Sequence, residues 1–386
     1  MWKTQNKEVY GMKPYKIYSD DIDPVALDQF FDAMKEDFVV QGAMMPDAHV
    51  GYSLPIGGVV ATNDVVVPAW VGFDIGCGMC ANKLNIKASM LDEVKDIIFN
   101  KIYDLVPVGR NAHPNDFLFN TLTTPSFQED VKDVCVRVGE SYEDAKVKLA
   151  SLGSGNHFIE IGADENKDVW IVVHSGSRHF GHSIASHYMK LASGTNKAKE
   201  GHFGFDANSE NGKAYIHDMN VALEYALYNR KIILYLVIDA IKMYLGQDDV
   251  SFVDEDALIN RNHNHAEERN GIWIHRKGAT HAEKGMMGVI PGNMRDGSYI
   301  VCGKGNPDSL YSSSHGAGRI LGRRKAKEQL DVNIFELMMS GIVAKVGKNT
   351  LDESPMVYKN INKVMENQED LVDVIAHVKP IINIKG

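Results

Sequence analysis

The chain has 386 residues, 44% of them hydrophobic, which is enough to bury at least one large core and excludes a disordered protein. Its formal net charge of −10 at pH 7 argues against nonspecific binding of nucleic acid over the whole surface, and leaves room only for a local basic groove. The longest apolar run, residues 232–241, is about half the length of a membrane span and contains Asp239, so we expect no membrane segment.

The number of cysteines and the N-terminal stretch indicate in which cellular compartment the protein lies. Four cysteines in a chain of this length do not form a disulfide framework, and a reducing environment suits a free thiol ligand. The stretch MWKTQNKEVYGMK lacks the apolar run of a signal peptide. We therefore expect a cytoplasmic protein.

The first half of the chain begins with helical spacing and then changes to strand patterns. Asp23 and Pro24 predict an N-cap and a first-turn proline, followed by a helix. Two β-branched runs around Asn63 and Asp64 predict a hairpin that leads into residues 74–80, so that this stretch ends a strand. Residues 89–106 again have helical spacing.

The second half predicts short strands around one long helix. Residues 157–162 and 168–176 form two β-type runs, each with a histidine at one end, and the chain between His157 and His174 is long enough for a strand, a turn and a return strand. Residues 213–245 predict a helix, and glycine-separated strands follow it. Since no repeat or linker marks a boundary, we expect a single α+β domain over residues 1–386.

The stretch DIGCGMC, residues 74–80, has three interpretations. A structural zinc site would need a second cysteine pair, and a thioredoxin-like redox pair would open a helix, whereas the residues after Cys80 predict a strand. The third interpretation takes Asp74 and Cys77 as ligands of one metal ion, with Gly76 and Gly78 letting the backbone curl around it. Cys80 is then an ordinary buried cysteine.

Three of the 15 histidines stand where a metal ligand is expected. His157 follows a glycine-rich turn, His174 ends an apolar strand, and His263 lies in a polar segment with His265 as its near competitor. A set of Asp, Cys and three His suits Mn, Fe, Co or Zn, and one thiolate could bridge two ions about 3.5–4 Å apart.

A further histidine, His315 in SSSHGAGR, has a different setting. It is either a surface loop residue or a nucleophile, because small neighbours let a phosphate approach and a neutral imidazole can attack a nucleotide α-phosphate. The sequence holds no Walker loop. Cationic residues near glycine turns predict a basic groove around this histidine: Arg276, Lys277, Lys304, Arg319, Arg323, Arg324 and Lys325.

Taken together, these stretches resemble one family, the RtcB RNA ligases, which join RNA ends with GTP and Mn²⁺. The resemblance rests on MPDAHVGYSLPIGG, VGFDIGCGMCA, LGSGNHFIE, VVHSGSR, RKGA, GVIPGNM, GKGNPDSLYSSSHGAGR, PMVYKNI and KPIINIKG, which occur in this order from Met45 to Gly386. It implies a single RtcB-type α+β domain, in which mixed short strands form a central β core flanked by helices.

The resemblance also implies roles for individual residues. Two Mn²⁺ ions would be held by Asp74, Cys77, His157, His174 and His263, with Cys77 shared between them. His315 would be guanylylated, Arg178 would bind the RNA terminal phosphate, and Asp47 would be a further active-site carboxylate. The GTP contacts would be Asn156, Phe158, Glu160, Ser298, Ala317, Tyr358 and Lys385.

The function expected from this set is ligation of an RNA 3′-phosphate or 2′,3′-cyclic phosphate to a 5′-hydroxyl, in RNA repair or tRNA splicing. The expected partners are GTP, broken tRNA or rRNA, and in some relatives an archease-like activator. A two-metal phosphodiester hydrolase that uses no nucleotide is an alternative from another class, and so is a metal-stabilised RNA-binding or sensor protein without turnover.

Overall fold

The computed structural model describes residues 13–386, and the N-terminal stretch used above lies almost wholly outside this range. Helices and strands alternate irregularly around largely antiparallel sheets, which confirms the α+β class. That residues 1–386 form a single domain stays a prediction. No helix of the described part is long and apolar enough to cross a membrane.

The larger of the two main sheets contains His174 and is bordered by His157 and His263, each one residue from a strand. Its strand order is β13-β14-β17-β6-β7-β5-β9, and neighbours along this path are antiparallel. The short strand β16, Val343–Ala344, adds a parallel pairing to β17. The bounds are β5 Gly78–Lys87, β6 Phe158–Ala163, β7 Asp168–Ser175, β9 Ile259–Asn262, β13 Met287–Pro291, β14 Ser298–Gly303 and β17 Val372–Lys385.

The second sheet has the order β1-β2-β3-β11-β10. The chain passes directly from the first sheet into the second between β9 and β10. Only His263 separates β9 of the larger sheet from β10, Asn264–Arg269, of the smaller one, so this residue lies at the junction of the two sheets. The other bounds are β1 Tyr15–Ile17, β2 Val39–His49, β3 Ile56–Asn63 and β11 Ile272–Lys277; the pairs β12 Ala279–His281 with β15 Ser312–Ser314, and β4 Val65–Val66 with β8 Phe205–Asp206, form two small sheets.

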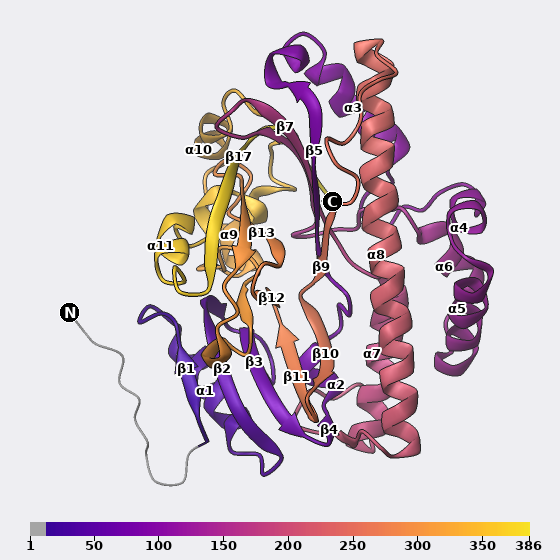
Figure 1. The fold of residues 1–386 in the computed structure, drawn as a ribbon, viewed down its shortest axis with the longest axis vertical. Coiled ribbons are helices and arrows are strands. Elements are labelled where there is room, and N and C mark those ends of the chain that lie inside the picture. The colour runs from indigo at the N-terminus through magenta and orange to yellow at the C-terminus, as the bar shows by residue number, and fades with distance from the viewer. Residues whose placement is uncertain (1–12) are drawn as a thin grey trace.

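Helix α8, Glu210–Leu245, runs along the length of the molecule beside the sheets (Figure 1). Ser209 caps its start by accepting a hydrogen bond from the Gly212 amide, and Gly246 ends it in the left-handed conformation. Its residues Ile233 and Val237 share a buried apolar cluster with Ile171 of β7, which fixes the helix against the larger sheet.

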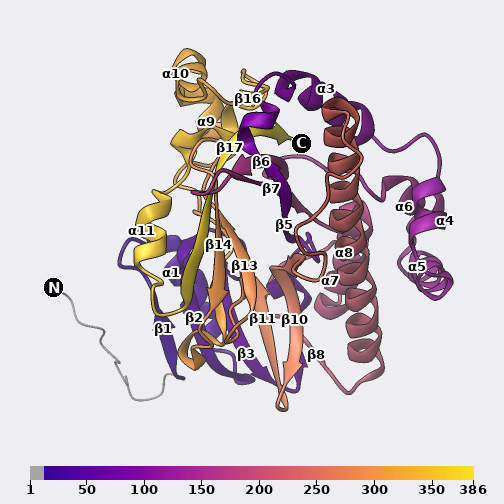
Figure 2. The same ribbon diagram turned by 45° about the horizontal axis from the view of Figure 1, so that its top comes forward.

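The remaining helices cover the outside of this core. In both ribbon views α4–α6 lie on the side of α8 that faces away from the sheets, and α9–α11 lie at the opposite side of the molecule (Figures 1 and 2). Their bounds are α1 Pro24–Met34, α2 Pro68–Val71, α3 Lys95–Leu105, α4 Phe117–Leu122, α5 Pro125–Val138, α6 Tyr142–Lys148, α7 Arg178–Ser193, α9 Arg323–Gln329, α10 Val332–Met338 and α11 Ile361–Glu366.

Two local predictions are wrong. The runs around Asn63 and Asp64 are not a hairpin, because β3 pairs with β2 and β11 while β4 pairs with β8. Residues 74–80 do not end a strand either: helix α2 precedes them, and β5 begins at Gly78. The long helix, the strands at β6 and β7 and the glycine-separated strands β11, β13 and β14 are confirmed.

Candidate metal centre and nucleotide cavity

Four adjacent strands bring the five predicted metal ligands to one place. Register pairs Gly78 of β5 with Ser175 of β7 and with Asn262 of β9, and pairs Phe158 of β6 with His174. The turn with Asp74 and Cys77 precedes β5, His157 precedes β6, and His263 follows β9. Because antiparallel neighbours alternate in direction, a start of one strand and an end of the next lie together, so these side chains converge.

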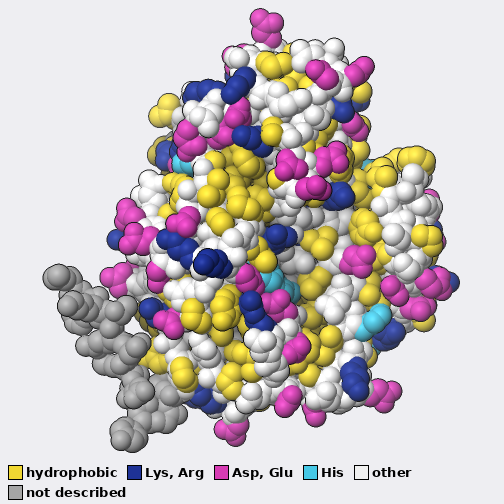
Figure 3. Space-filling model, viewed as in Figure 1, with side chains coloured by type: hydrophobic (Ala, Val, Ile, Leu, Met, Phe, Trp, Pro, Cys, Tyr) yellow, Lys and Arg dark blue, Asp and Glu magenta, His cyan; other side chains and the backbone are white. Residues whose placement is uncertain are grey.

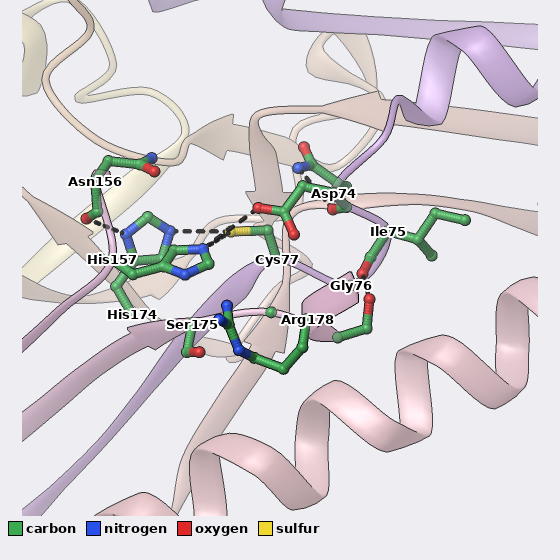
Figure 4. Close-up of polar contacts among 12 residues, drawn as sticks. Asp74, Ile75, Gly76, Cys77, Asn156, His157, His174, Ser175 and Arg178 are labelled. Atoms are coloured by element: carbon green, nitrogen blue, oxygen red, sulfur yellow. Dashed lines mark hydrogen bonds and ion pairs between the residues drawn. The ribbon is translucent and has the colours of Figure 1, made fainter. Parts of the chain in front are cut away.

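Cys77 lies at the centre of the cluster. Its Sγ atom is 3.3 Å from His157 Nε2 and 3.3 Å from His174 Nε2 (Figure 4). His174 Nε2 is 3.4 Å from His263 Nε2, and Asp74 Oδ2 is 3.3 Å from His157 Nε2. The donor atoms of Cys77, His157 and His174 all lie within 4.8 Å of one another, and the three side chains are buried.

Backbone carbonyls orient the two imidazoles that contact the thiol. His157 Nδ1 lies 3.0 Å from the carbonyl oxygen of Leu152, and His174 Nδ1 lies 3.1 Å from that of Asn156. A ring whose Nδ1–H donates to a carbonyl keeps the lone pair on Nε2, the atom that here faces Cys77. The tautomer needed for metal binding is therefore set by the fold.

The electrostatics of the cluster also suit a cation. Burial and then the neighbouring histidines lower the pKa of His174 and of His263 well below the usual value, so both rings are neutral. Desolvation would raise the pKa of Asp74, but its contact with His157 lowers it to about 2. Burial, and then Asp74, raise the pKa of the Cys77 thiol, so a thiolate here needs a positive partner.

The donor set fits transition-metal ions such as Mn²⁺. One thiol, one carboxylate and three imidazoles converge, and the buried Nδ1 of His263 finds no hydrogen-bond partner among the described residues. His265, its competitor in the sequence, lies elsewhere: it is on β10 opposite Arg276 and accepts a hydrogen bond from the Arg276 Nη1 atom at 3.2 Å.

Both glycines of the DIGCG turn are required by the geometry. Gly76 has φ +76°, a left-handed conformation that side chains disfavour. A Cβ atom on Gly78 would lie 2.1 Å from the carbonyl oxygen of Arg261 on β9, so only glycine lets these strands pair this closely. Cys80, three positions after Cys77, is fully buried in the apolar cluster beside α8, as predicted.

A second group of possible donors, His265, Glu267 and His281, lies on β10 and β12. Buried Arg276 already neutralises it: its Nη1 atom is 2.6 Å from Glu267 Oε1 and also donates to His265. Since a guanidinium occupies the place that a metal ion would take, this group is an ion-pair network.

His315 follows β15 and is held by Asp47 of β2. Its Nδ1 atom lies 2.6 Å from Asp47 Oδ2, which also accepts hydrogen bonds of 3.2 Å from the amides of His315 and Gly316. The carboxylate lies at ion-pair distance from Nδ1, in a contact that lacks hydrogen-bond geometry, and Nε2 forms no hydrogen bond with a described residue. The ring of His263 lies 4.8 Å away, centroid to centroid, so His315 borders the metal cluster.

A cavity of about 930 Å³ opens beside His315. Six of the predicted GTP contacts lie in or at its wall, and Ser298 is fully buried on β14 behind them. The cavity-lining residues among those predicted are His174, Asn156, Phe158, Glu160, His315, Ala317, Tyr358 and Lys385.

Glu160 and Lys385 are two of the predicted GTP contacts. Burial raises the pKa of Glu160 to about 8, although Ser298 and Lys385 partly offset this, and Asn383 donates to its Oε2 atom at 3.4 Å. Lys385 Nζ lies 3.2 Å from Glu353 Oε2, and Tyr358 donates its hydroxyl to the same carboxylate. Sequence reasoning missed Glu353, whose only signal was an acidic residue shortly before PMVYKNI.

Arg178 begins α7 and lies beside the metal cluster. Its Nε atom donates to Ser151 Oγ at 3.1 Å and its Nη2 atom to the Gly109 carbonyl at 3.2 Å. In Figure 4 its side chain extends on the same side of the cluster as His157 and His174. Its own φ of +60° is unusual for a non-glycine residue, and such strain is typical of functional positions.

Gly153 makes room for both Arg178 and His157. A Cβ atom there would lie 2.0 Å from Arg178 Nη1 and 2.6 Å from His157 Nδ1, and its φ is +98°. We expect Gly153→Ala to lower the free energy of unfolding by about 2–4 kcal/mol, from left-handed strain and overpacking, and to weaken metal binding. Denaturant unfolding and metal titration measure both effects.

The matched control is Gly139→Ala, at a helix end with φ +73° and open space around the added atom. In this variant only backbone strain should lower the free energy of unfolding, by about 1 kcal/mol. Equal losses in the two variants would contradict a packing role for Gly153.

The predicted basic groove is only partly formed. Arg276 and Lys277 are buried, and Lys304 lies at the wall of a different pocket. Arg319, Arg323 and Lys325 line the large cavity. On the face in Figure 3 basic and acidic side chains are mixed, which agrees with a basic region limited to the cavity mouth.

The structure thus defines an α+β protein with a candidate transition-metal site beside a large cavity that His315 lines. The chain belongs to the RtcB family, since the family model described as tRNA-splicing ligase RtcB matches residues 29–386. It is 33% identical to the RNA-splicing ligase RtcB of Escherichia coli (strain K12) over 97% of each chain. It is 28% identical to the tRNA-splicing ligase RtcB of Nanoarchaeum equitans (strain Kin4-M), over 97% of this chain and 95% of the relative.

Proposed function

We propose that this protein is a GTP-dependent RNA ligase that joins an RNA 3′-phosphate or 2′,3′-cyclic phosphate end to a 5′-hydroxyl end. One observation supports this most directly: His315 has its Nδ1 atom held by Asp47 while its ring borders both the metal cluster and the cavity. In a hydrolase that needs no nucleotide such a histidine would serve as a general acid or base, so covalent labelling by GTP is what distinguishes the two functions.

In the first step Nε2 of His315 attacks the α-phosphorus of GTP. A nitrogen–phosphorus bond forms, the bond from that phosphorus to the bridging oxygen breaks, and pyrophosphate leaves. The imidazole gains positive charge, which the Asp47 carboxylate, 2.6 Å from Nδ1, would stabilise.

In the second step an oxygen of the RNA 3′-phosphate attacks the same phosphorus, and the bond to His315 breaks. The RNA end then carries GMP as its leaving group. In the third step the 5′-hydroxyl oxygen attacks the RNA phosphorus, loses its proton and expels GMP, so that a phosphodiester remains. A cyclic phosphate end is first opened by water.

Two Mn²⁺ ions would be held by Asp74, Cys77, His157, His174 and His263, and would supply positive charge to the phosphates and lower the pKa of a bound hydroxyl or water. Arg178 is a cationic side chain held in a fixed orientation beside this cluster, and we assign it the RNA terminal phosphate. In this arrangement His315 would hold the nucleotide and Arg178 would hold the RNA end.

Selectivity for guanine would come from Glu160. Guanine presents two donors, N1–H and the exocyclic amine, where adenine presents an acceptor and a donor, so an ionised carboxylate favours guanine. Lys385 would face the guanine carbonyl, and Tyr358 would stack on the base; both side chains are held by Glu353.

GTP affinity is expected to rise with pH. Free Glu160 has a pKa of about 8, whereas guanine binds its ionised form, so binding must first remove a proton below this pH. Affinity should increase by up to about tenfold per pH unit from about pH 6.5 to pH 8 and level off above. Titration of GTP into His315→Ala, which cannot react covalently, measures this.

The Glu160→Gln variant should bind GTP weakly with no such slope. A flat profile in the protein with Glu160 intact would show that the carboxyl group does not face the base.

The proposed function is tested by incubating the protein with Mn²⁺ and GTP labelled at the α-phosphate, and then adding RNA strands with 3′-phosphate and 5′-hydroxyl ends. We expect an acid-labile label on the protein, its transfer to RNA, and a joined product. Absence of label on the protein, or joining without GTP, would overturn the proposal.

A further inference from the structure

The mouth of the cavity carries exposed apolar side chains as well as cations. Val50, Tyr52 and Ile320 all line it, with exposed fractions of 41%, 73% and 60%. Single exposed apolar residues are common, but three that line the same cavity indicate a surface that contacts a ligand. None of the GTP contacts described above involves them.

The loop that presents Tyr52 is fixed. Gln29 of α1 donates to the carbonyl oxygens of Gly51 at 3.0 Å and Tyr52 at 2.6 Å, and accepts from the Gly51 amide at 3.0 Å. A Cβ atom on Gly51 would lie 2.4 Å from the Leu54 carbonyl oxygen, so the loop turns tightly. The ring is therefore exposed on a backbone that loses little freedom when a ligand binds.

Cations accompany the ring at the same opening. Arg323 and Lys325 line the cavity and are exposed, and Lys325 forms no ion pair with any residue from 13 to 386. Arg323 is paired with Asp352 and Glu353, so Lys325 is the unpaired one of these two cations. An exposed aromatic ring together with a cation in one cavity wall is the combination that binds single-stranded nucleic acid, by base stacking and phosphate contacts.

We propose that Tyr52 is a stacking platform for an unpaired nucleobase at the RNA end being joined. This rests on the proposed function for the identity of the strand, and it adds a binding subsite outside the GTP pocket. The flat ring accepts any base, so the subsite contributes affinity and positioning and not sequence choice.

The test uses oligoribonucleotides with 2-aminopurine, whose fluorescence is quenched by stacking, at the terminal nucleotide. One set ends in a 3′-phosphate and the other in a 5′-hydroxyl, so the two arms identify which strand reaches Tyr52. We expect Tyr52→Ala to weaken binding of one set by about 5- to 100-fold and to abolish its quenching. Tyr52→Phe should retain both.

Two controls separate stacking from a general defect. Phe117→Ala removes a ring of similar exposure (64%) from α4 and should change nothing. A strand with an abasic terminal nucleotide should bind Tyr52→Ala and the unaltered protein equally. Unchanged binding of both sets, a loss that persists with the abasic strand, or an equal loss of GTP affinity would overturn the proposal.

Failure of the proposed function gives a different result. If the unaltered protein takes up no label from GTP, the proposed ligation reaction is wrong. Quenching by Tyr52 is measured by RNA binding alone, so the stacking proposal is tested independently of ligation.

Discussion

The His315→Ala variant is expected to take up no label from GTP and to lose RNA joining by on the order of 10³-fold or more. The reason is chemical: no other described imidazole lies in the cavity wall with one nitrogen held by a carboxylate and the other free. Covalent labelling followed by acid treatment, and a gel assay of joined RNA, measure the two effects.

The same variant should keep its metal, because His315 is not among the five donors. His377→Ala is the matched control: this histidine stacks on Tyr299 at 4.0 Å and does not line the cavity, so labelling should persist. Label retained in His315→Ala would place the nucleophile elsewhere. RNA cleavage that survives His315→Ala and depends on Cys77 would favour the hydrolase.

Local pattern predicted the part of the site that local structure builds. His157 and His174 flank one antiparallel pair, β6 and β7, so strand periodicity and the length between them were enough to place the two imidazoles together. The hairpin at Asn63 and Asp64 failed because β4 pairs with β8, far along the chain, and no local signal encodes such a pairing.

Long-range contacts decide the rest of the site. His263 and His265 were equivalent in the sequence, and only the β9–β10 junction directs the first to the cluster and the second to Arg276. The cationic residues of this part of the sequence predicted a basic groove that includes Arg276 and Lys277, but both side chains are buried. A sequence shows the charge of a side chain but not the carboxylate that will neutralise it, and Glu353 was missed for the same reason.

Replacing Cys77 with alanine is expected to weaken metal binding by about 100-fold or more and to abolish both GTP labelling and RNA joining. Cys77 Sγ is the atom that contacts both His157 and His174, so its loss removes the shared ligand rather than a peripheral one. Metal content after dialysis, measured by mass spectrometry, gives the first effect, and the two assays above give the others.

Cys80→Ala separates this chemistry from packing. Cys80 is also buried, three positions along the same segment, but its thiol lies in the apolar cluster beside α8. It should cost about 1 kcal/mol of unfolding free energy and leave metal content and labelling intact. If the two cysteine variants lost metal equally, the cluster would be a packing arrangement and not a metal centre. If Cys77→Ala alone loses it, then the pairing of β5 with β7 and β9, and of β7 with β6, is what assembles the site, because it brings that thiol to the three imidazoles.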